Sequence, residues 1–476
     1  MNLLLDLQIL GWLLVGLGLL QGIPVLGALV SGEPLLPYVA SAGIALLYGL
    51  PIALSIRPLE RRMHVRDGFV VTVFAWLLAS IFGALPYVLS GALSPVDAFF
   101  ESVAGFTTTG STTLTRIEGL PHALLLWRSL TQWLGGMGII VFTIAVVPLL
   151  GIGGMQLFRA EVPGPVKDKL TPRIAVTAQR LWLIYFGLTG LAFVALLVTG
   201  MGLFDALCHA LTTLATGGFS TRDASIAAFG PGAQWVIVVF MALAGTNFAL
   251  HYRVLAGRLL DVARDVELHL YLIFIALGSG TIVWLLSEAG VTEQTLRIAF
   301  FQVVSILTTT GFATDDYELW PAAGQFLIFH LLLVGGMAGS TAGGIKTLRF
   351  VLGINALRTF VWRLTHPHAM RGVRYAGRSV SEDVVSGVAV FFLAYLLIAG
   401  IAGFIVAMHG YDLVTSMSAA FTAIGNVGPG LGGVGPTDNF AHFPALVKLV
   451  LAFCMIAGRL EVFTVLVILE PHFWRR

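Results

Sequence analysis

Charged residues and cysteines are scarce in this chain, and their scarcity excludes whole classes of protein. Only 11% of the 476 residues are Asp, Glu, Lys or Arg, whereas an ordinary soluble domain is about 25% charged. A hydrophobic share of 57% and a mean hydropathy of +0.91 exclude a soluble globular domain. The two cysteines, Cys208 and Cys454, lie within predicted helices and do not constitute a disulfide framework.

Motifs of nucleotide chemistry and of nucleophilic catalysis are also missing. The sequence holds no phosphate loop, no dinucleotide fingerprint and no pairing of a nucleophile with a base. We therefore expect no enzymatic activity and no organic cofactor on this chain, so that an ATP- or NAD-using step would belong to another subunit. A net charge of +2 gives no indication of nucleic-acid binding either.

Long apolar runs are abundant. A helix needs roughly 20 apolar residues to cross the hydrocarbon core, and ten such runs occur at about 3–30, 36–56, 68–90, 123–150, 178–200, 232–256, 268–288, 322–350, 384–408 and 441–470. The sequence therefore predicts an all-α polytopic membrane protein with ten crossings. The first run is too long for a signal peptide and lacks a basic start, so we expect a retained helix.

Basic residues are concentrated in alternate connections and at the end of the chain. Cytoplasmic loops carry an excess of Lys and Arg, so we place these connections and both termini in the cytoplasm. Docking of a cytosolic partner or of anionic lipid is a second possible use of the same charges. The residues are Arg57, Arg61, Arg62, Arg66, Arg159, Lys167, Lys169, Arg173, Arg253, Arg258, Arg264, Arg349, Arg358, Arg363, Arg371, Arg374, Arg378, Arg475 and Arg476.

Four short segments repeat one pattern of residues. In each, a large apolar residue stands four positions before a final glycine, and Thr or Asn stands two positions before it. Each segment follows an apolar stretch too short to span the membrane, which indicates a re-entrant helix. The segments are Phe106–Gly110, Leu214–Gly218, Leu307–Gly311 and Ile424–Gly428, and the short stretches lie at about 96–106, 204–214, 295–307 and 412–423.

This pattern suits a path for a monovalent cation. Removing water from such an ion requires several oxygens at close range, which carbonyl-lined segments supply, and glycine allows the backbone conformations that turn carbonyls toward an axis. Glycines that serve only helix packing are the alternative, but they have no reason to recur four times in one register. The predicted filter residues are Thr108, Thr109, Gly110, Thr216, Gly217, Gly218, Thr309, Thr310, Gly311, Asn426, Val427 and Gly428.

Two further features lie within predicted crossings. The stretch from Gly335 to Gly344 contains five glycines together with Ser340 and Thr341. Each glycine destabilises a helix by about 1 kcal/mol relative to alanine, so we expect this stretch to be non-helical. A glycine surface that serves only helix packing is the alternative. Arg459 is a charge inside a membrane segment, which is a functional hypothesis by default. Pairing with Glu461 to hold helices together is the alternative, although residues two apart do not share a helix face.

Asp97 and Asp205 are expected to cap two of the short helices.

Several longer motifs identify a family resemblance over essentially the whole chain. They are Trp133–Gly138, Gly245–His251, Gly336–Lys346, Gly425–Gly430 and Gly458–Glu461. The chain resembles the membrane subunit of the Trk/Ktr/HKT superfamily of potassium transporters, in its TrkH-like bacterial branch. The resemblance implies four helix–pore-helix–helix repeats around a central pore, with two additional N-terminal helices.

The resemblance also implies ligands, partners and a gate. It implies K⁺ as the transported ion, bound at the predicted filter residues, a homodimer in the bacterial inner membrane, and a cytosolic nucleotide-binding subunit like TrkA. The implied gate is an intramembrane loop below the filter, together with the pore-facing arginine, and comprises Gly336, Gly339, Ser340, Thr341, Gly343, Gly344, Lys346 and Arg459.

We therefore predict K⁺ uptake by channel-like conduction. Coupled symport with H⁺ or Na⁺ is the first alternative, and a membrane enzyme or non-transporting scaffold is an alternative of another class. The predicted division of the chain is an N-terminal extension at 1–56, pore repeats at 57–150, 151–260 and 261–350, a cytoplasmic linker at 351–381 and a fourth repeat at 382–476.

Overall fold

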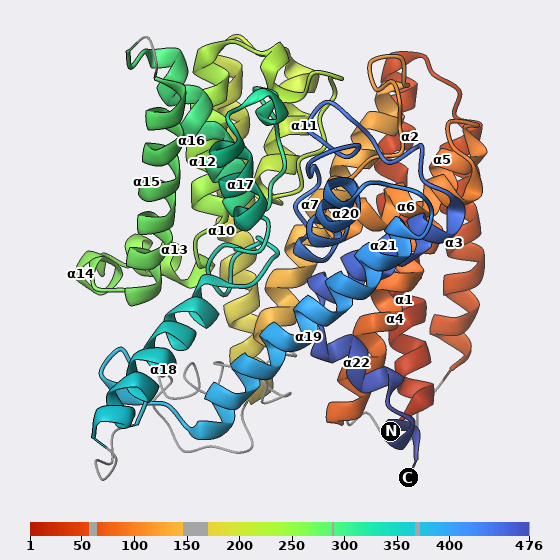
Figure 1. The fold of residues 1–476 in the computed structure, drawn as a ribbon. Coiled ribbons are helices and arrows are strands. Elements are labelled where there is room, and N and C mark those ends of the chain that lie inside the picture. The colour runs from red at the N-terminus through yellow and green to blue at the C-terminus, as the bar shows by residue number, and fades with distance from the viewer. Residues whose placement is uncertain (57–63, 146–169, 288–289, 367–371, 476) are drawn as a thin grey trace.

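The protein is almost entirely helical. The computed structural model describes residues 1–56, 64–145, 170–287, 290–366 and 372–475. Within them, strands occur only in one short antiparallel hairpin, formed by β1 (Arg374–Tyr375) and β2 (Arg378–Ser379). The predicted all-α class is confirmed (Figure 1).

The N-terminal extension has three helices, of which the first and the third pack closely against each other. It comprises α1 (Leu3–Leu20), α2 (Gly22–Ser31) and α3 (Leu36–Ser55). Glycines allow α1 and α3 to approach closely, because a Cβ added at Gly49 would lie 2.9 Å from the Cβ of Leu14.

Four units follow, and each contains a short helix between longer ones. The first has α4 (Val65–Gly83), α5 (Leu85–Leu89), α6 (Pro95–Phe106) and α7 (His122–Ala145); the second has α10 (Leu170–Val198), α11 (Leu203–Leu214), η1 (Ser225–Ala228), α12 (Pro231–Ala244), α13 (Phe248–Leu255) and α14 (Leu259–Ala263). The third has α15 (Val266–Leu286), α16 (Glu293–Leu307), η2 (Tyr317–Leu319), α17 (Ala322–Leu331) and α18 (Thr347–Thr365); the fourth has α19 (Glu382–Ala407), α20 (Leu413–Gly425), α21 (Ala445–Arg459), α22 (Phe463–Leu469) and α23 (Pro471–Trp474).

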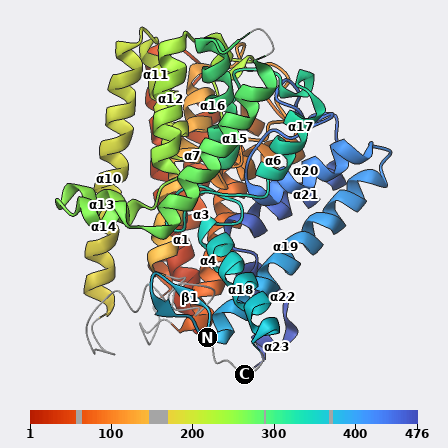
Figure 2. The same ribbon diagram turned by 60° about the vertical axis from the view of Figure 1, so that its left-hand side comes forward.

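The four short helices α6, α11, α16 and α20 match the predicted re-entrant helices closely. They lie in the same half of the molecule, opposite the end at which both termini emerge (Figure 1). The ends of the chain meet there, because Arg66 donates a hydrogen bond to the carbonyl of Arg475 at 3.0 Å and the rings of Phe69 and Phe473 are in contact. Figure 2 shows α18, α22 and α23 at this same end.

The membrane crossings are less regular than the ten predicted continuous runs. Among the described residues, six helices are long and apolar enough to span a membrane, and two bent pairs would bring the number to eight. The predicted crossings at 232–256 and 441–470 are these pairs, with bends of 98° between α12 and α13 and 115° between α21 and α22. The predicted crossing at 322–350 is also interrupted, since α17 ends at Leu331 and α18 begins at Thr347.

Each bend has a local cause. Asn247 caps α13 by accepting a hydrogen bond from the backbone N–H of Ala249, which starts a new helix in a new direction. Between α21 and α22, Glu461 and Val462 have φ of 63° and 52°. Non-glycine residues rarely adopt these values, and a right-handed helix cannot continue through them.

The predicted division into repeats and linker stays a prediction. Several of its boundaries, and the basic residues Arg57, Arg61, Arg62, Arg159, Lys167, Lys169, Arg371 and Arg476, lie outside the described residues. The predicted linker at 351–381 contains most of α18 and the β1–β2 hairpin.

Candidate functional site

The four glycine-containing segments share one backbone turn. The residue two positions before each final glycine has a left-handed conformation, with φ of 53° at Thr108, 53° at Thr216, 56° at Thr309 and 54° at Asn426. The final glycines also have positive φ, of 83° at Gly110, 78° at Gly218, 79° at Gly311 and 111° at Gly428. Left-handed non-glycine residues are uncommon, so their recurrence at matching positions identifies one repeated structural unit.

Each turn ends its short helix in the same way. After α6, the backbone N–H groups of Thr108 and Thr109 donate to the carbonyls of Gly105 and Ala104 at 2.9 and 2.8 Å, which is a Schellman motif. The bond to the fifth residue back recurs for Gly217, Thr310 and Val427, at 2.9, 2.8 and 3.0 Å. These N–H groups are consumed by the helix ends, so the segments present mainly oxygens to their surroundings.

The four turns close into a ring in chain order. A Cβ added to a final glycine would lie closer than 3.0 Å to a carbonyl oxygen of the following segment, a separation that real Cβ atoms essentially never show. The last segment meets the first in the same way, so the ring has no open side. The facing pairs are Gly110 with Gly217, Gly218 with Thr310, Gly311 with Val427, and Gly428 with Thr109.

Side-chain oxygens differ between the four corners of the ring. The Thr108 hydroxyl and the Asn426 Oδ1 are buried and, among the described residues, have no hydrogen-bond partner. Asn426 Nδ2 donates to the Thr109 hydroxyl at 2.9 Å and to the Met455 carbonyl at 2.8 Å. Unpaired buried oxygens are costly, and a bound cation would satisfy them.

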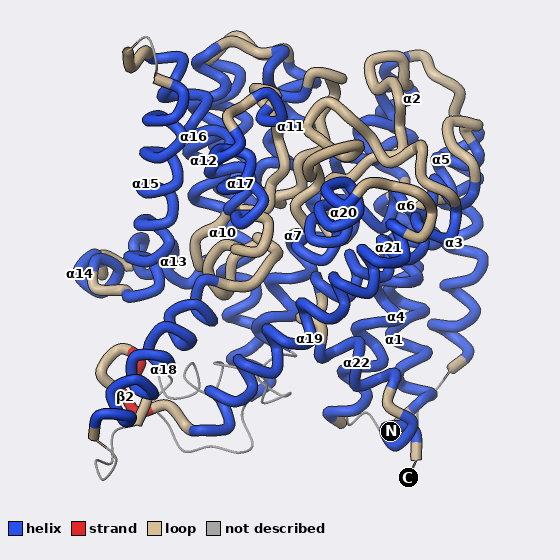
Figure 3. Tube along the Cα trace, in the orientation of Figure 1, coloured by secondary structure: helices blue, strands red, loops and turns tan. Residues whose placement is uncertain are grey.

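The predicted departure from helix at 335–344 is confirmed, and it lies between α17 and α18 (Figure 3). We call residues 332–346 the central loop. It contacts the turns directly, because the Gly343 N–H donates to the Thr309 hydroxyl at 2.6 Å. The Thr341 hydroxyl donates to the carbonyl of Leu214, the last residue of α11, at 3.1 Å. The loop therefore lies against the carboxyl end of α11 and the turn that follows α16.

Arg459, the last residue of α21, also contacts the central loop. It is 2% exposed, and its Nη1 donates to the Thr341 carbonyl at 2.7 Å. Its Nη2 is 3.4 Å from the Gly135 carbonyl. Glu461 pairs with Arg349 instead, so the alternative of an Arg459–Glu461 pair is not what the structure shows.

The other predicted gate residues all belong to the central loop and are held by backbone contacts. The Gly339 carbonyl accepts from the Phe248 N–H at 3.1 Å, and the Gly336 carbonyl accepts from the Thr347 N–H at 3.1 Å. The Ser340 hydroxyl donates to the Met337 carbonyl at 2.6 Å. Lys346 Nζ donates to the carbonyl of Ala342, and Gly344 has a φ of 64°.

Two groups of charged residues near the site were missed by the sequence analysis. Glu267, in the first turn of α15, accepts hydrogen bonds from the N–H groups of Ala338 and Leu348 at 2.6 and 3.0 Å, which anchors the central loop. Glu101 and Arg128 form a buried ion pair at 2.8 Å behind the turns. Arg128 lies in the predicted crossing at 123–150 and Glu101 in the short stretch at 96–106, so the rule that singled out Arg459 applies to this pair. Glu267 directly precedes the predicted crossing at 268–288, so that rule did not single it out.

The expectation that Asp97 and Asp205 cap short helices was wrong. The N-cap residues are Ser94 and Gly202, and the two aspartates lie three positions later. Asp97 pairs with Lys448, and Asp205 pairs with Arg222 at 2.8 Å. A carboxylate in the first turn interacts favourably with the helix dipole, as an N-cap carboxylate does. The residue type alone therefore does not distinguish an N-cap position from a first-turn position.

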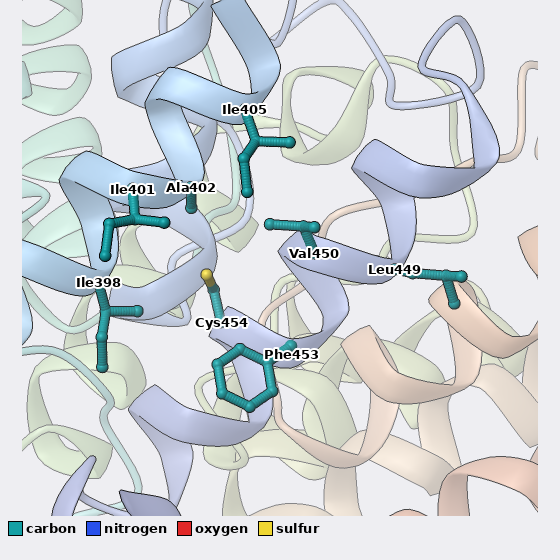
Figure 4. Close-up of a pocket in the computed structure, with 8 residues that line it drawn as sticks. All are labelled: Ile398, Ile401, Ala402, Ile405, Leu449, Val450, Phe453 and Cys454. Atoms are coloured by element: carbon teal, nitrogen blue, oxygen red, sulfur yellow. The ribbon is translucent and has the colours of Figure 1, made fainter. Parts of the chain in front are cut away.

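A groove between α19 and α21 lies away from the ring. It has a volume of about 350 Å³ and is lined by Ile398, Ile401, Ala402, Ile405, Leu449, Val450, Phe453 and Cys454 (Figure 4). Apart from the buried Cys454 thiol, these side chains are hydrocarbon. The groove offers no oxygen ligands for a cation, so it is not part of a cation path.

Four short helices, a closed ring of left-handed turns and a non-helical loop beneath them define a polytopic membrane protein built around one central site. Comparison with known proteins specifies the family. Residues 52–475 match the model of the TrkH family, described as a cation transport protein, and the chain belongs to that family. This confirms the resemblance noted in the sequence, and the family is one of transport proteins rather than enzymes.

Individual relatives are similar over their full lengths. The chain is 41% identical to the Trk system potassium uptake protein TrkH of Halomonas elongata over 485 residues, covering 100% of both chains. It is 40% identical to the protein of the same name from Escherichia coli K12, covering 94% of this chain and 95% of that one. The crystal structure of the potassium transporter TrkH from Vibrio parahaemolyticus superposes with a TM-score of 0.92 at 35% identity, covering 100% of both chains.

Proposed function

We propose that this protein takes up K⁺ across the inner membrane of a bacterium, by channel-like conduction through the ring of four turns. The observation that carries the proposal is the ring itself, in which four matching turns direct their N–H groups into helix ends and keep oxygens available. A dehydrated K⁺ requires such a group of oxygens. The names of the relatives, which are potassium uptake proteins, support the choice of ion.

The filter comprises the twelve predicted residues of the four turns. The carboxyl end of α11 lies against the central loop, and a helix carboxyl end carries partial negative charge that favours a cation. The unpaired oxygens of Thr108 and Asn426 supplement the backbone carbonyls. Because a Cβ at any final glycine would overlap a neighbouring carbonyl, the ring depends on glycine at all four corners.

The central loop and Arg459 form the gate. The loop is not helical and is held by individual hydrogen bonds, among them Gly343 to Thr309 and Arg459 to Thr341, so its displacement would not unfold a membrane helix. Arg459 adds a positive charge that repels a passing cation. The protein would form a homodimer and bind a cytosolic nucleotide-binding subunit like TrkA. That subunit would displace the loop from the side of the termini, which we assign to the cytoplasm.

Flux measurements on reconstituted protein test this function. Protein-only liposomes should take up K⁺ and Rb⁺ faster than Na⁺, and the uptake should follow voltage without a proton or sodium gradient. Uptake that requires such a gradient at zero voltage would identify coupled symport. No cation flux under either condition would contradict the proposal.

A further inference from the structure

The second corner of the ring lacks a side chain that the other three corners have. The residue just before the final glycine is Thr109, Thr310 or Val427 in the first, third and fourth turns, but Gly217 in the second. We propose that Gln132, a residue of the first repeat, occupies this space, holds the Gly217 carbonyl in position and thereby helps to set the discrimination between K⁺ and Na⁺. This inference rests on the proposed function of the ring.

Gln132 makes two hydrogen bonds to the second turn. It lies on α7, is fully buried, and its Nε2 donates to the Gly217 carbonyl at 2.5 Å. Its Oε1 accepts from the N–H of Phe219 at 3.1 Å. The amide therefore spans Gly218 and fixes the backbone on both sides of the final glycine.

The side chain of Gln132 and a side chain at position 217 would occupy the same volume. A Cβ added at Gly217 would lie closer than 3.0 Å to the Cδ, Oε1 and Nε2 atoms of Gln132. The missing side chain of the second turn is thus replaced by one from a neighbouring repeat.

The matching position in the second repeat shows what Gln132 replaces. Gly136 and Gly245 occupy equivalent positions in the first and second repeats. A Cβ at Gly136 would contact the Tyr185 hydroxyl and Ala215, and a Cβ at Gly245 would contact the Tyr271 hydroxyl and Thr308. Ala215 and Thr308 each directly precede a left-handed residue of a turn. Four residues earlier stand Gln132 and Met241, both fully buried. The turn that follows Met241 has its own side chain, Thr310, and there the helix supplies an apolar residue instead of an amide.

The hydrogen bond makes one corner of the ring different for an ion. The Gly217 carbonyl faces Gly110 in the ring and also accepts the amide N–H. In the described part of the chain, no donor hydrogen-bonds to the carbonyls of Thr109, Thr310 or Val427. Freeing the Gly217 carbonyl would raise the field that the ring exerts on an ion, and a stronger field favours the smaller Na⁺.

The test replaces Gln132 by the residue of the second repeat. In reconstituted Gln132→Met protein, the K⁺/Na⁺ permeability ratio from reversal potentials should fall roughly fivefold to tenfold, as expected for loss of one buried hydrogen bond. Met241→Leu is the matched control, because it changes a buried side chain at the equivalent position without touching a ring carbonyl, and it should keep the parental ratio.

A double variant separates ion discrimination from folding. Gly217→Ala alone should lower thermal stability because its Cβ would overlap Gln132, and Gln132→Ala alone should lower it by leaving a cavity. Combined, they should recover stability above either single variant, while the K⁺/Na⁺ ratio stays low because the carbonyl still has no donor. This variant carries the test where Gln132→Met yields little folded protein.

A folded Gln132→Met protein with the parental ratio would overturn the inference, as would a double variant less stable than both single ones. Reduced yield with an unchanged ratio would make Gln132 a packing residue only. Absence of K⁺ flux in the parent would be the failure of the proposed function itself, and it would remove this inference with it.

Discussion

Replacing Arg459 is the most direct perturbation of the proposed gate. Its Nη1 donates to the Thr341 carbonyl at 2.7 Å, and the residue is 2% exposed. A hydrogen bond from a charged donor contributes roughly 1.5–3 kcal/mol, so its loss should shift the opening of the central loop by roughly tenfold to a hundredfold. No carboxylate is paired with Arg459 in the described structure, so removal leaves no unpaired buried charge behind.

Removal of the charge acts in the same direction. A cation passing at about 8 Å would be repelled by roughly 2 kcal/mol at an effective dielectric constant of 20, and water in the path would reduce this value. Arg459→Ala should therefore increase inward K⁺ flux at least tenfold. Arg459→Lys should preserve most of the restriction, because the charge survives although the two-pronged donor does not.

Rb⁺ uptake and thermal stability measured on the same liposome preparations distinguish a gate from a structural tie. Met455→Leu, one turn earlier on α21, is the control for packing and should leave uptake unchanged. Parental uptake by Arg459→Ala, together with lower stability, would refute the role in the gate.

Two further substitutions and a deletion test the ring and the loop. Gly110→Ser should lower the K⁺/Na⁺ permeability ratio, because the Cβ would overlap the Gly217 carbonyl and displace it; an unchanged ratio in well-folded protein would count against the ring. Deletion of Gly339–Gly344 should raise basal K⁺ flux in liposomes and weaken any dependence on the proposed cytosolic subunit, and parental flux from a folded deletion variant would make the loop structural. Glu267→Gln should raise basal flux roughly fivefold, because the neutral amide is a weaker acceptor for the Ala338 and Leu348 N–H groups; Glu293→Gln, an exposed acid of α16, is the control, and equal flux from both variants would exclude the anchor.

The short helices and their turns were predictable because the sequence repeats them. A left-handed residue and a glycine at fixed spacing leave a local signature, and the predicted helix at 204–214 differs from α11 by one residue. Hydropathy, in contrast, continues through the bends at Asn247 and Glu461, since a change of direction needs only a cap or two positive φ values.

Contacts between distant segments were not predictable in the same way. Glu267 anchors a loop 71 residues later, and Gln132 reaches a turn 85 residues later. No local pattern encodes such a partner. The Arg459 side chain was recognised from its charge, but the carbonyl that it binds became apparent only in three dimensions.

The closure of the ring from Gly428 back to Thr109 has a genetic consequence. In an assembly of four identical subunits, one codon change alters every corner at once. Here each corner is encoded separately, so it can accumulate changes alone, and a single mutation perturbs one quarter of the ring. The contrast between Thr216 and Asn426, or between Gly217 and Val427, is a kind of divergence that a ring of four identical subunits cannot acquire.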